Sequence, residues 1–551
     1  MTFSRGKKNL WCSIAAVVAA LLLWAAYPPH NETLAILVAL VPMLVVARRS
    51  SPKRSALFFF LFGFIFWMLS LSWMPAIIKN NGPWPLVVLG WFALAAACAG
   101  YLALYGFCAA WLWRHREDAC PLAPQLPWTA APPFSSVACI LGEAALWAIF
   151  EYLRATLFTG FAWNFLGTAF ASMPSFATPA RFGGVYLVSV LVVLLNGVFA
   201  TLMMRVFAPV MGGMDASCAS DAVTEDSAPP CASRFRARLV QICETGLPLA
   251  FILVCLCIGN RLVRGEAMSG GARFVATEDG TKPVPPRTTA HLRVALVQRN
   301  APCCFKPGKR ENAYEAFGKL LDAVAAAKPD LVVLAESAMS EFGTVRSFRA
   351  QDVARGFLER SGAAALIAGG DDVVDGRTYN AVALYAPDGN AGIGPIAVYH
   401  KQHLVPFGEY IPFDKWITPL QKLSPVGVSL HPGEPALLEI ATSGGRKLKV
   451  APLICYEDTD PRLAAKAKKM GADLIVLVTN DSWFSESAEA EAHAAQAVLR
   501  AIETGLPILR VGNSGVTGVI RPDGSANWLV DTSGRPLVDA PGVMVETIVV
   551  K

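Results

Sequence analysis

The chain has 551 residues, 54% of them hydrophobic and 16% charged, with a formal net charge of +6. This length exceeds the usual single-domain range, so two domains are expected. The basic residues gather in particular loops rather than on one face, which argues against a nucleic-acid partner. The thirteen cysteines form no CxxC pair, and many lie in apolar runs where cysteine acts as a small apolar residue. Neither a disulfide framework nor a metal or cofactor site is predicted.

The first half of the sequence predicts a bundle of membrane helices. A run of about 20 apolar residues is long enough to cross a bilayer. A signal peptide is an alternative for the first run, because Arg5, Lys7 and Lys8 precede it. The runs that follow favour a retained anchor. We predict about seven spans, at 10–27, 33–47, 56–78, 85–112, 136–153, 184–204 and 239–262.

Lysine and arginine alternate between loops and so predict the orientation of the bundle. The loops before 10, after 47, after 112 and after 204 carry most of them. The amino terminus is therefore expected in the cytoplasm. Seven crossings would place the chain after Leu262 on the periplasmic or outer face of a bacterial inner membrane.

The predicted bundle comprises residues 1–264. Two of its segments do not have the pattern of a membrane span. Residues 209–235 are polar and without period, which indicates a flexible cytoplasmic linker. Residues 155–183 are apolar and aromatic but broken by glycines. We expect this second segment to lie as an arm in the membrane interface, and a plain helix–helix connection is the alternative.

The pattern changes after a second predicted linker, 265–290. Residues 291–551 alternate between strand-like and helix-like periods, which predicts an α/β domain with functional residues at strand ends. The strands are expected at 291–297, 331–334, 364–368, 381–385, 449–454, 474–478 and 507–511, and helices at 311–327, 462–470 and 488–503.

Three residues of different chemistry follow strand-like runs in this domain. Glu336 is a carboxylate among apolar neighbours, whose pKa should be raised and which could act as a base. Lys401 could stabilise an oxyanion, and Cys455 is a candidate nucleophile. Each has a plain alternative: a helix cap, a solvated lysine and a packed cysteine. Their combination at strand ends favours a thiol enzyme.

The motifs around these residues resemble the Glu–Lys–Cys motifs of the nitrilase superfamily, and more closely the apolipoprotein N-acyltransferase family. The resemblance covers nearly the whole chain. It departs where the family has tryptophan-proline-glutamate, which here is Leu334-Ala335-Glu336. It departs again after the catalytic domain, where the family usually has a last membrane helix and this sequence shows no apolar run after its last strand, up to Lys551. The matching stretches are Leu334–Ala338, Tyr399–Pro412, Ile454–Glu457, Thr479–Phe484 and, in the first half, Glu151–Arg154 with Thr159–Trp163.

The resemblance implies an αββα sandwich joined to the membrane bundle, and an acyl transfer in two steps. An acyl chain would pass from a membrane phospholipid to Cys455, and then to the α-amino group of a diacylglyceryl-modified lipoprotein. Glu336 would be the base, and Lys401 with the backbone N–H after Cys455 would hold the oxyanion. A monomer without cofactor is expected. By the same resemblance, Glu409, Glu457 and Tyr456 would support the triad, and Trp483 and Phe484 would bind substrate.

Two other functions are compatible with parts of the sequence. A membrane-anchored nitrilase-type amidase would use the same triad with water as the second substrate. A transporter or lipid scaffold would carry the domain as an inactive binding module. The predicted membrane spans and the apolar arm favour a lipid acyl donor over a small amide. We also expect Trp483 and Phe484 to lie on a mobile loop that guards the substrate pocket.

Overall fold

The computed structural model describes residues 5–80, 82–115, 133–206, 230–268, 273–277, 280–284, 289–302, 313–387, 394–411, 429–442 and 444–551. The chain forms two compact units. One comprises Met1–Ser72 with Val88–Asn260, and the other comprises Trp73–Val87 with Arg261–Lys551. The linker predicted at 209–235 lies outside the described residues except for 230–235, where a helix begins.

The first unit is helical. Six helices in the described part of the chain are long and apolar enough to cross a membrane, one fewer than the sequence predicts. They lie within α1 (Arg5–Ala25), α3 (Pro52–Ser70), α5 (Trp84–Arg114), α6 (Pro133–Thr156), α7 (Ala180–Val206) and α9 (Pro230–Met268); the shorter helices are η1 (Thr33–Leu37), α2 (Val41–Arg49), η3 (Leu166–Ser172) and η4 (Pro174–Phe176).

The span predicted at 33–47 is wrong as a continuous helix. It consists of η1 and the nine-residue α2, with a break between them. Asn196 of α7 supplies the hydrogen bonds that the break leaves open. Its side chain accepts from Leu40 N at 2.9 Å and donates to Ile36 O at 2.9 Å. Irregular backbone is tolerated inside a membrane protein where it is buried and its polar groups are satisfied.

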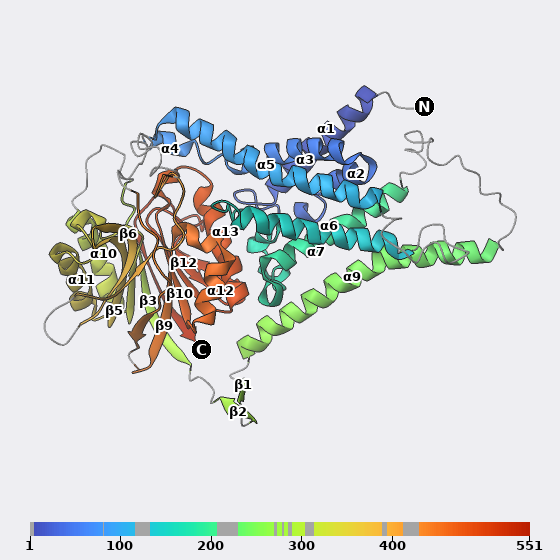
Figure 1. Cartoon of the computed structure of the whole chain (residues 1–551). Helices are drawn as coiled ribbons and strands as arrows, with labels where there is room; N and C mark the ends of the chain where they lie inside the picture. The colour runs from blue at the N-terminus through green and yellow to red at the C-terminus, as the bar shows by residue number, and fades with distance from the viewer. Residues whose placement is uncertain are drawn as a thin grey trace. The chain divides into compact units, whose positions relative to one another are not determined.

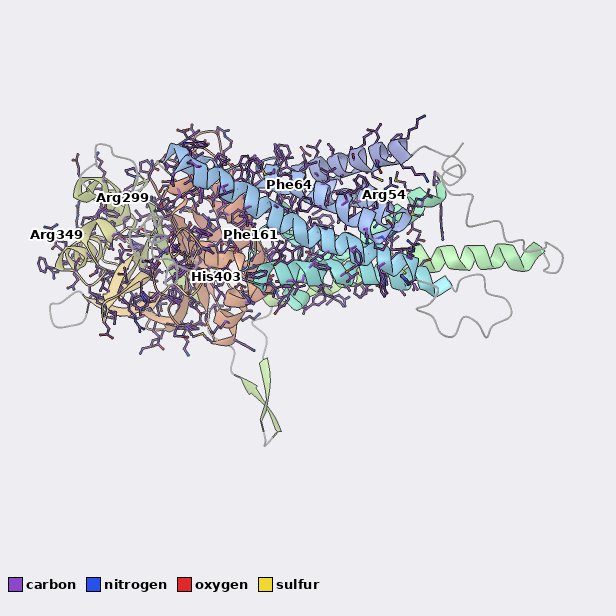
Figure 2. The ribbon with its side chains drawn as sticks, turned by 45° about the horizontal axis from the view of Figure 1, so that its top comes forward. Arg54, Phe64, Phe161, Arg299, Arg349 and His403 are labelled. Carbon is purple, nitrogen blue, oxygen red and sulfur yellow. The ribbon has the colours of Figure 1, made fainter. Side chains whose placement is uncertain are left out.

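This broken segment nevertheless runs the length of the bundle. Arg54 at the start of α3 contacts Cys12 near the start of α1, and Tyr27 after the end of α1 packs on Phe66 near the end of α3. The two helices are therefore parallel, and the chain between them must return. In Figure 2, Arg54 lies toward one end of this unit and Phe161 toward the other. The 19 residues of α3 span about 28 Å, close to the thickness of a hydrocarbon core.

The arm expected at 155–183 is buried over residues 162–170 and exposed at its tip. Trp163, Phe165 and Leu166 are buried, whereas Phe158 at the tip is fully exposed. Two charged side chains of α6 hold the arm from inside. Arg154 donates to the carbonyls of residues 161 and 163 at 2.6 and 2.7 Å, and Glu151 accepts from the backbone N–H of Leu166 at 2.8 Å. These bonds satisfy charges that would be costly in an apolar bundle.

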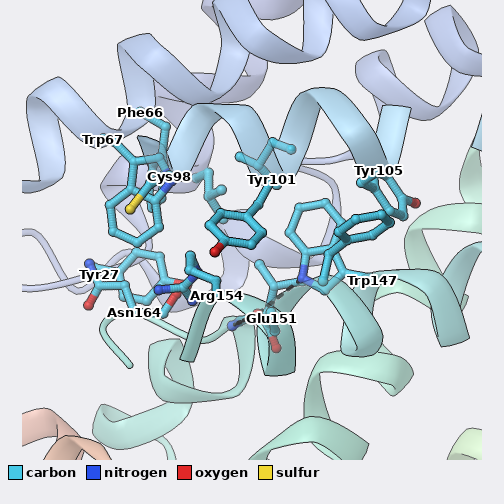
Figure 3. Close-up of a pocket in the computed structure, with 14 residues that line it drawn as sticks. Tyr27, Phe66, Trp67, Cys98, Tyr101, Tyr105, Trp147, Glu151, Arg154 and Asn164 are labelled. Carbon is cyan, nitrogen blue, oxygen red and sulfur yellow. Dashed lines mark hydrogen bonds between the residues drawn. The ribbon is translucent and has the colours of Figure 1, made fainter. Parts of the chain in front are cut away.

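Beside these charges the helical unit contains a narrow, largely aromatic cavity (Figure 3). Helices α1, α3, α5 and α6 contribute to it, and Trp147 donates to Glu151 at 3.0 Å within its wall. The arm closes one side through Asn164. The cavity therefore shares its polar groups with the bonds that fix the arm.

The second unit is an α/β sandwich, with α4 (Ala76–Lys79) added from the chain between two membrane helices. One six-stranded sheet has the order β14-β3-β4-β5-β6-β7 and the other β13-β12-β11-β10-β9-β8. Strands β3, β4 and β5 are parallel neighbours, as are β9, β10 and β11. Figure 1 shows α10 and α11 beyond one sheet and α12 and α13 beyond the other.

Every strand and helix predicted in this unit is present, β5 and β6 are longer than predicted, and β8, β12, β13, β14 and α11 were not predicted. The strands are β3 (Ala290–Gln298), β4 (Leu331–Leu334), β5 (Ala365–Val374), β6 (Arg377–Tyr385), β7 (Pro395–His400), β8 (Leu438–Ala441), β9 (Lys447–Ile454), β10 (Leu474–Thr479), β11 (Ile508–Gly512), β12 (Gly518–Ile520), β13 (Ala526–Trp528) and β14 (Gly542–Val550). The helices are α10 (Ala313–Ala327), η5 (Ser340–Phe342), α11 (Phe348–Ser361), η7 (Cys455–Thr459), α12 (Pro461–Lys469), η8 (Asp481–Phe484) and α13 (Glu489–Thr504). The linker predicted at 265–290 holds the end of α9 and a hairpin of β1 (Arg273–Thr277) and β2 (Gly280–Val284).

Alternation along the strands produces the layers. Leu296 and Val333 of one sheet and Val450 and Val476 of the other belong to a single buried cluster, so the two sheets share a core. Residues pointing the opposite way, such as Val332, pack under α10 and α11. This sandwich brings the ends of β4, β7 and β9 toward one region.

Candidate active site

Glu336, Lys401 and Cys455 each follow the end of a strand, as predicted. Glu336 comes two residues after β4, while Lys401 and Cys455 directly follow β7 and β9. The structure brings the three within electrostatic range of one another. Both Glu336 and Lys401 influence the pKa of the Cys455 thiol. Residues from two different sheets therefore share one site.

Lys401 is the buried centre of this site. It is 1% exposed, and its ammonium contacts Glu409 Oε1 at 2.9 Å. Burial opposes the charged form, but interactions with Glu409 and with other titratable groups around it outweigh this effect, so the pKa of Lys401 lies above its ordinary value of 10.5. The lysine is a permanent cation at neutral pH. A fixed buried cation of this kind can stabilise charge that develops next to it.

Asn380 on β6 links the two carboxylates that flank the lysine. Its amide donates to Glu336 Oε1 at 2.7 Å and to Glu409 Oε1 at 2.8 Å. Glu336 is buried, and this burial, followed by the charge of Glu409, raises its pKa above 4.5 although Lys401 and Asn380 lower it. A carboxylate with a raised pKa is a better proton acceptor than an ordinary one.

The backbone carrying Glu336 packs unusually close to the neighbouring strand. A Cβ atom at Gly369 of β5 would lie 2.6 Å from the Glu336 Cα and 2.8 Å from the carbonyl oxygen of Ala335. Only glycine fits this approach without displacing the turn. The position of the carboxylate is therefore set by the sheet beneath it.

Cys455 lies at the start of a tight turn, η7, with a φ of 51°. This left-handed conformation is strained for a residue with a side chain and is typical of functional positions. Glu457 fixes the turn: its carboxylate accepts from Ile454 N at 2.8 Å and Gln402 N at 2.7 Å. The hydroxyl of Tyr399 also donates to it at 2.9 Å. Glu457 thus ties the cysteine turn to the lysine loop.

The half-buried thiol is not activated by its surroundings alone. Burial and then the nearby Glu336 carboxylate raise the pKa of Cys455 well above 9.0, while Lys401 lowers it. The resting cysteine is therefore a thiol at neutral pH. Because the thiolate is the nucleophile, a base must take this proton during the reaction.

Tyr456 and the aromatic pair Trp483–Phe484 lie at the edge of the site region. Tyr456 is half-buried and packs edge-on against His403 with ring centres 5.5 Å apart. Trp483 and Phe484 form the end of η8, after β10, and are also half-buried. Like Cys455, they follow a strand of the second sheet.

The loop of Trp483 and Phe484 is held more firmly than a free gate would be. Asn80, next to α4, donates to the backbone carbonyls of Ser482 and Trp483 at 3.2 and 2.8 Å. Trp73 packs edge-on against Phe484 at 4.7 Å. The chain segment between two membrane helices therefore anchors this loop within the second unit.

Residues 19–198 match the family model described as the apolipoprotein N-acyltransferase N-terminal domain, and residues 293–550 match that of carbon-nitrogen hydrolase. A protein of Allorhizobium ampelinum named apolipoprotein N-acyltransferase is 31% identical over 488 residues, covering 85% of this chain and 76% of the relative. The chain belongs to the apolipoprotein N-acyltransferase family. The predicted fold class, a membrane helix bundle joined to a nitrilase-like domain, is confirmed.

Other members of this N-acyltransferase family align over similar lengths. The relative from Geobacter metallireducens is 27% identical over 92% of this chain and 84% of its own length. That from Ralstonia nicotianae is 28% identical over 87% and 77%. An amidase structure from Nesterenkonia is 20% identical, with a TM-score of 0.34, and covers 47% of this chain and 90% of its own.

Sequence reasoning missed two residues that organise the site of this N-acyltransferase family member. Asn380 directly precedes the predicted apolar strand 381–385, and a polar residue next to such a run is a signal that could have been read. Asn80 lies in a short loop between predicted spans, and nothing local connects it to residues 482–483. Sequence reasoning also did not group Asp481, Glu489 and His493. Among the described residues, atoms of these three side chains that could bind a metal ion lie within 4.8 Å of one another. His493 and the neighbouring Arg510 balance these carboxylates without a metal.

The anchored loop leads to a first prediction. Replacing both Trp483 and Phe484 by alanine should slow acyl transfer by about tenfold or more while the melting temperature falls little, since both side chains are only half-buried. Asn80→Ala, which frees the loop without removing an aromatic ring, should give a smaller loss. Rates and melting curves of both variants in detergent check this. A large fall in melting temperature with normal specific activity would assign the pair to the core.

Proposed function

We propose that the chain transfers an acyl chain from a membrane phospholipid, through a thioester on Cys455, to the α-amino group of the diacylglyceryl-cysteine at a lipoprotein N-terminus. The observation that carries this is the grouping of the strained Cys455 turn with a buried cation and a buried base, Lys401 and Glu336. The membrane helices support a lipid donor. The proposed catalytic unit is a monomer.

In the first step Glu336 takes the thiol proton as the sulfur of Cys455 attacks the ester carbonyl carbon. The carbonyl oxygen becomes an oxyanion next to the Lys401 ammonium and the backbone N–H that follows Cys455. Collapse of this tetrahedral species breaks the ester C–O bond. The departing lysophospholipid oxygen takes the proton from Glu336, and the acyl group remains on sulfur.

In the second step the α-amine of the lipoprotein attacks the thioester carbonyl. The oxyanion forms in the same place, so the same cation serves both steps. Glu336 accepts a proton from the attacking nitrogen, and the C–S bond breaks. The sulfur then takes that proton from Glu336, which returns the site to its resting state with a neutral thiol and a free carboxylate.

This proposal is tested by following the mass of the intact protein. Incubation with phosphatidylethanolamine of defined acyl chains should add the mass of one acyl chain, and peptide mapping should place it on Cys455. Addition of a diacylglyceryl-modified lipopeptide should return the protein to its original mass and acylate the peptide amine. Release of free fatty acid without acylation of the peptide would instead support an amidase-type hydrolase, and no added mass would refute the thioester.

The same proposal includes an orientation with the catalytic domain outside the cytoplasm. Six long helices and the broken segment at 33–49 give seven crossings. Arg48 and Arg49 end that segment and Lys53 and Arg54 begin α3, so basic residues gather at one end of the bundle. That end is proposed to be cytoplasmic.

Labelling of introduced cysteines in intact cells checks this orientation. The exposed position Asp523 lies in the catalytic unit, and the exposed position Lys53 lies at the basic end of the bundle. A membrane-impermeant maleimide should label Asp523→Cys once the outer membrane is permeabilised, but Lys53→Cys only after cell lysis. The parent protein accounts for native cysteines. The reverse pattern would overturn the orientation.

A further inference from the structure

A cluster of buried charges lies behind the nucleophile turn and takes no part in the chemistry described above. It comprises Asp458 on η7, Asp481 on η8, His493 and Glu489 on α13, and Arg510 on β11. All five side chains are at most 4% exposed. Burying this many charges costs stability unless each charge is paired, so we ask what function the cluster serves.

His493 is the centre of the cluster and binds a carboxylate on each side. Its Nε2 lies 3.0 Å from Asp458 Oδ1, and its Nδ1 lies 3.0 Å from Asp481 Oδ1. Both partners are acceptors, so both ring nitrogens must carry a proton. The imidazolium therefore bridges the turn that begins at Cys455 and the loop that ends at Phe484.

The remaining members balance the charge. Arg510 donates to Asp481 Oδ2 at 3.2 Å, which gives two cations for two aspartates. Glu489 approaches His493 Nδ1 at 3.5 Å, but burial and then the charge of Asp481 raise its pKa to about 8. This raised pKa favours the neutral form of Glu489, so Glu489 adds little negative charge to the cluster. A Cβ at Gly515 would collide with Asp481 Oδ2, so this carboxylate is also enclosed sterically.

Thr479 extends the cluster toward the nucleophile. Its hydroxyl donates to Asp481 Oδ1 at 2.7 Å, the same oxygen that lies 3.0 Å from His493 Nδ1. Burial and then Glu336 raise the pKa of the Cys455 thiol, whereas Thr479 lowers it. The position of Thr479 therefore depends on Asp481, which His493 and Arg510 hold in place.

We infer that His493 is a positioning residue for the acyl transfer, which ties the Cys455 turn to the Trp483 loop through Asp458 and Asp481. This inference rests on the proposed role of Cys455 as nucleophile. His493 holds the backbone that carries the sulfur, whereas Glu336 and Lys401 act directly on the reaction.

The test is the reactivity of Cys455 in His493→Gln, measured on the full-length protein. Glutamine cannot donate to two carboxylates on opposite sides. The rate of alkylation of Cys455 by iodoacetamide, followed by peptide mass spectrometry across pH, should fall about tenfold or more, as expected when a reacting group is misplaced. Its pH profile should also shift to higher pH, since Asp481 would hold Thr479 less firmly, and Thr479 lowers the pKa of Cys455. Acyl-enzyme formation should slow in parallel.

Thr504→Val is the matched control. Thr504 is also buried on α13, and its hydroxyl donates to Arg500 O at the far end of the helix. This variant should lower the melting temperature and leave the alkylation rate and its pH profile unchanged. If His493→Gln does not fold, the pair His493→Gln with Asp458→Asn carries the test, because it removes one positive and one negative charge together. Normal alkylation in either folded variant would overturn the inference.

Alkylation does not require the acyl donor or acceptor to be correctly identified. A protein in which His493→Gln slows alkylation, but which forms no thioester with phospholipid, would keep the positioning role and refute the proposed function. If the parent protein forms the thioester with phospholipid but His493→Gln is alkylated at the normal rate, the proposed function stands and the positioning role is refuted. The two proposals can therefore fail separately.

Discussion

Replacing Cys455 by alanine is expected to abolish acyl transfer while the protein still folds and enters the membrane. The expected loss is roughly 10⁶-fold, typical of removing a covalent nucleophile. Among the residues brought together with Glu336 and Lys401, Cys455 alone has a side chain able to form a thioester. The side chain of Cys455 is only half-buried, and alanine removes a single heavy atom from it. The melting temperature should therefore change little.

Two comparisons make this result specific. Cys455→Ser keeps the shape, but its hydroxyl is far less acidic than a thiol, so little or no acyl-enzyme should accumulate. Cys257→Ser changes an exposed cysteine of α9 and should leave transfer unchanged. Activity is measured as acylation of a diacylglyceryl lipopeptide, and the acyl-enzyme as intact mass. Full activity in Cys455→Ala would show that the triad is wrongly assigned.

The sequence was a good guide where a local pattern determines structure. Buried strands such as 331–334 and 474–478 are short apolar runs, and chemistry at their ends follows from how sheets present their edges. Glu336, Lys401 and Cys455 could therefore be found one by one. Their mutual approach could not, because it depends on the pairing of two sheets and on Asn380, which lies far from Glu336 along the chain.

The membrane half shows a different limit. Hydropathy reports how apolar a segment is, and 33–47 is apolar enough to suggest a helix. The break between η1 and α2 is stabilised by Asn196, about 160 residues away, so no local signal reveals it. The arm is similar: glycines suggest irregular backbone, but its burial depends on Glu151 and Arg154 binding its peptide groups. Tertiary hydrogen bonds override local patterns in both places.

Lys401→Met is expected to reduce acyl-enzyme formation by about 100-fold or more, because one oxyanion contact alone typically contributes this much. A second effect adds to it. Lys401 lowers the pKa of Glu336, which burial and Glu409 raise. Without the lysine, the pKa of Glu336 rises further, and the base becomes protonated over a larger part of the neutral range. Base and oxyanion stabiliser are then weakened together.

The pH profile separates these two effects. The rate depends on unprotonated Glu336, so it falls as pH decreases through the pKa of that group. In Lys401→Met this acid limb should move to higher pH, and raising the pH should recover the base but not the oxyanion contact. Glu336→Gln should remove the acid limb altogether, with a loss that pH does not reverse. Thioester formation is measured by intact mass at each pH, with circular dichroism to check folding, since Glu409 loses its buried partner. A normal rate of thioester formation in folded Lys401→Met would give the lysine a structural role, because neither step would then depend on its charge.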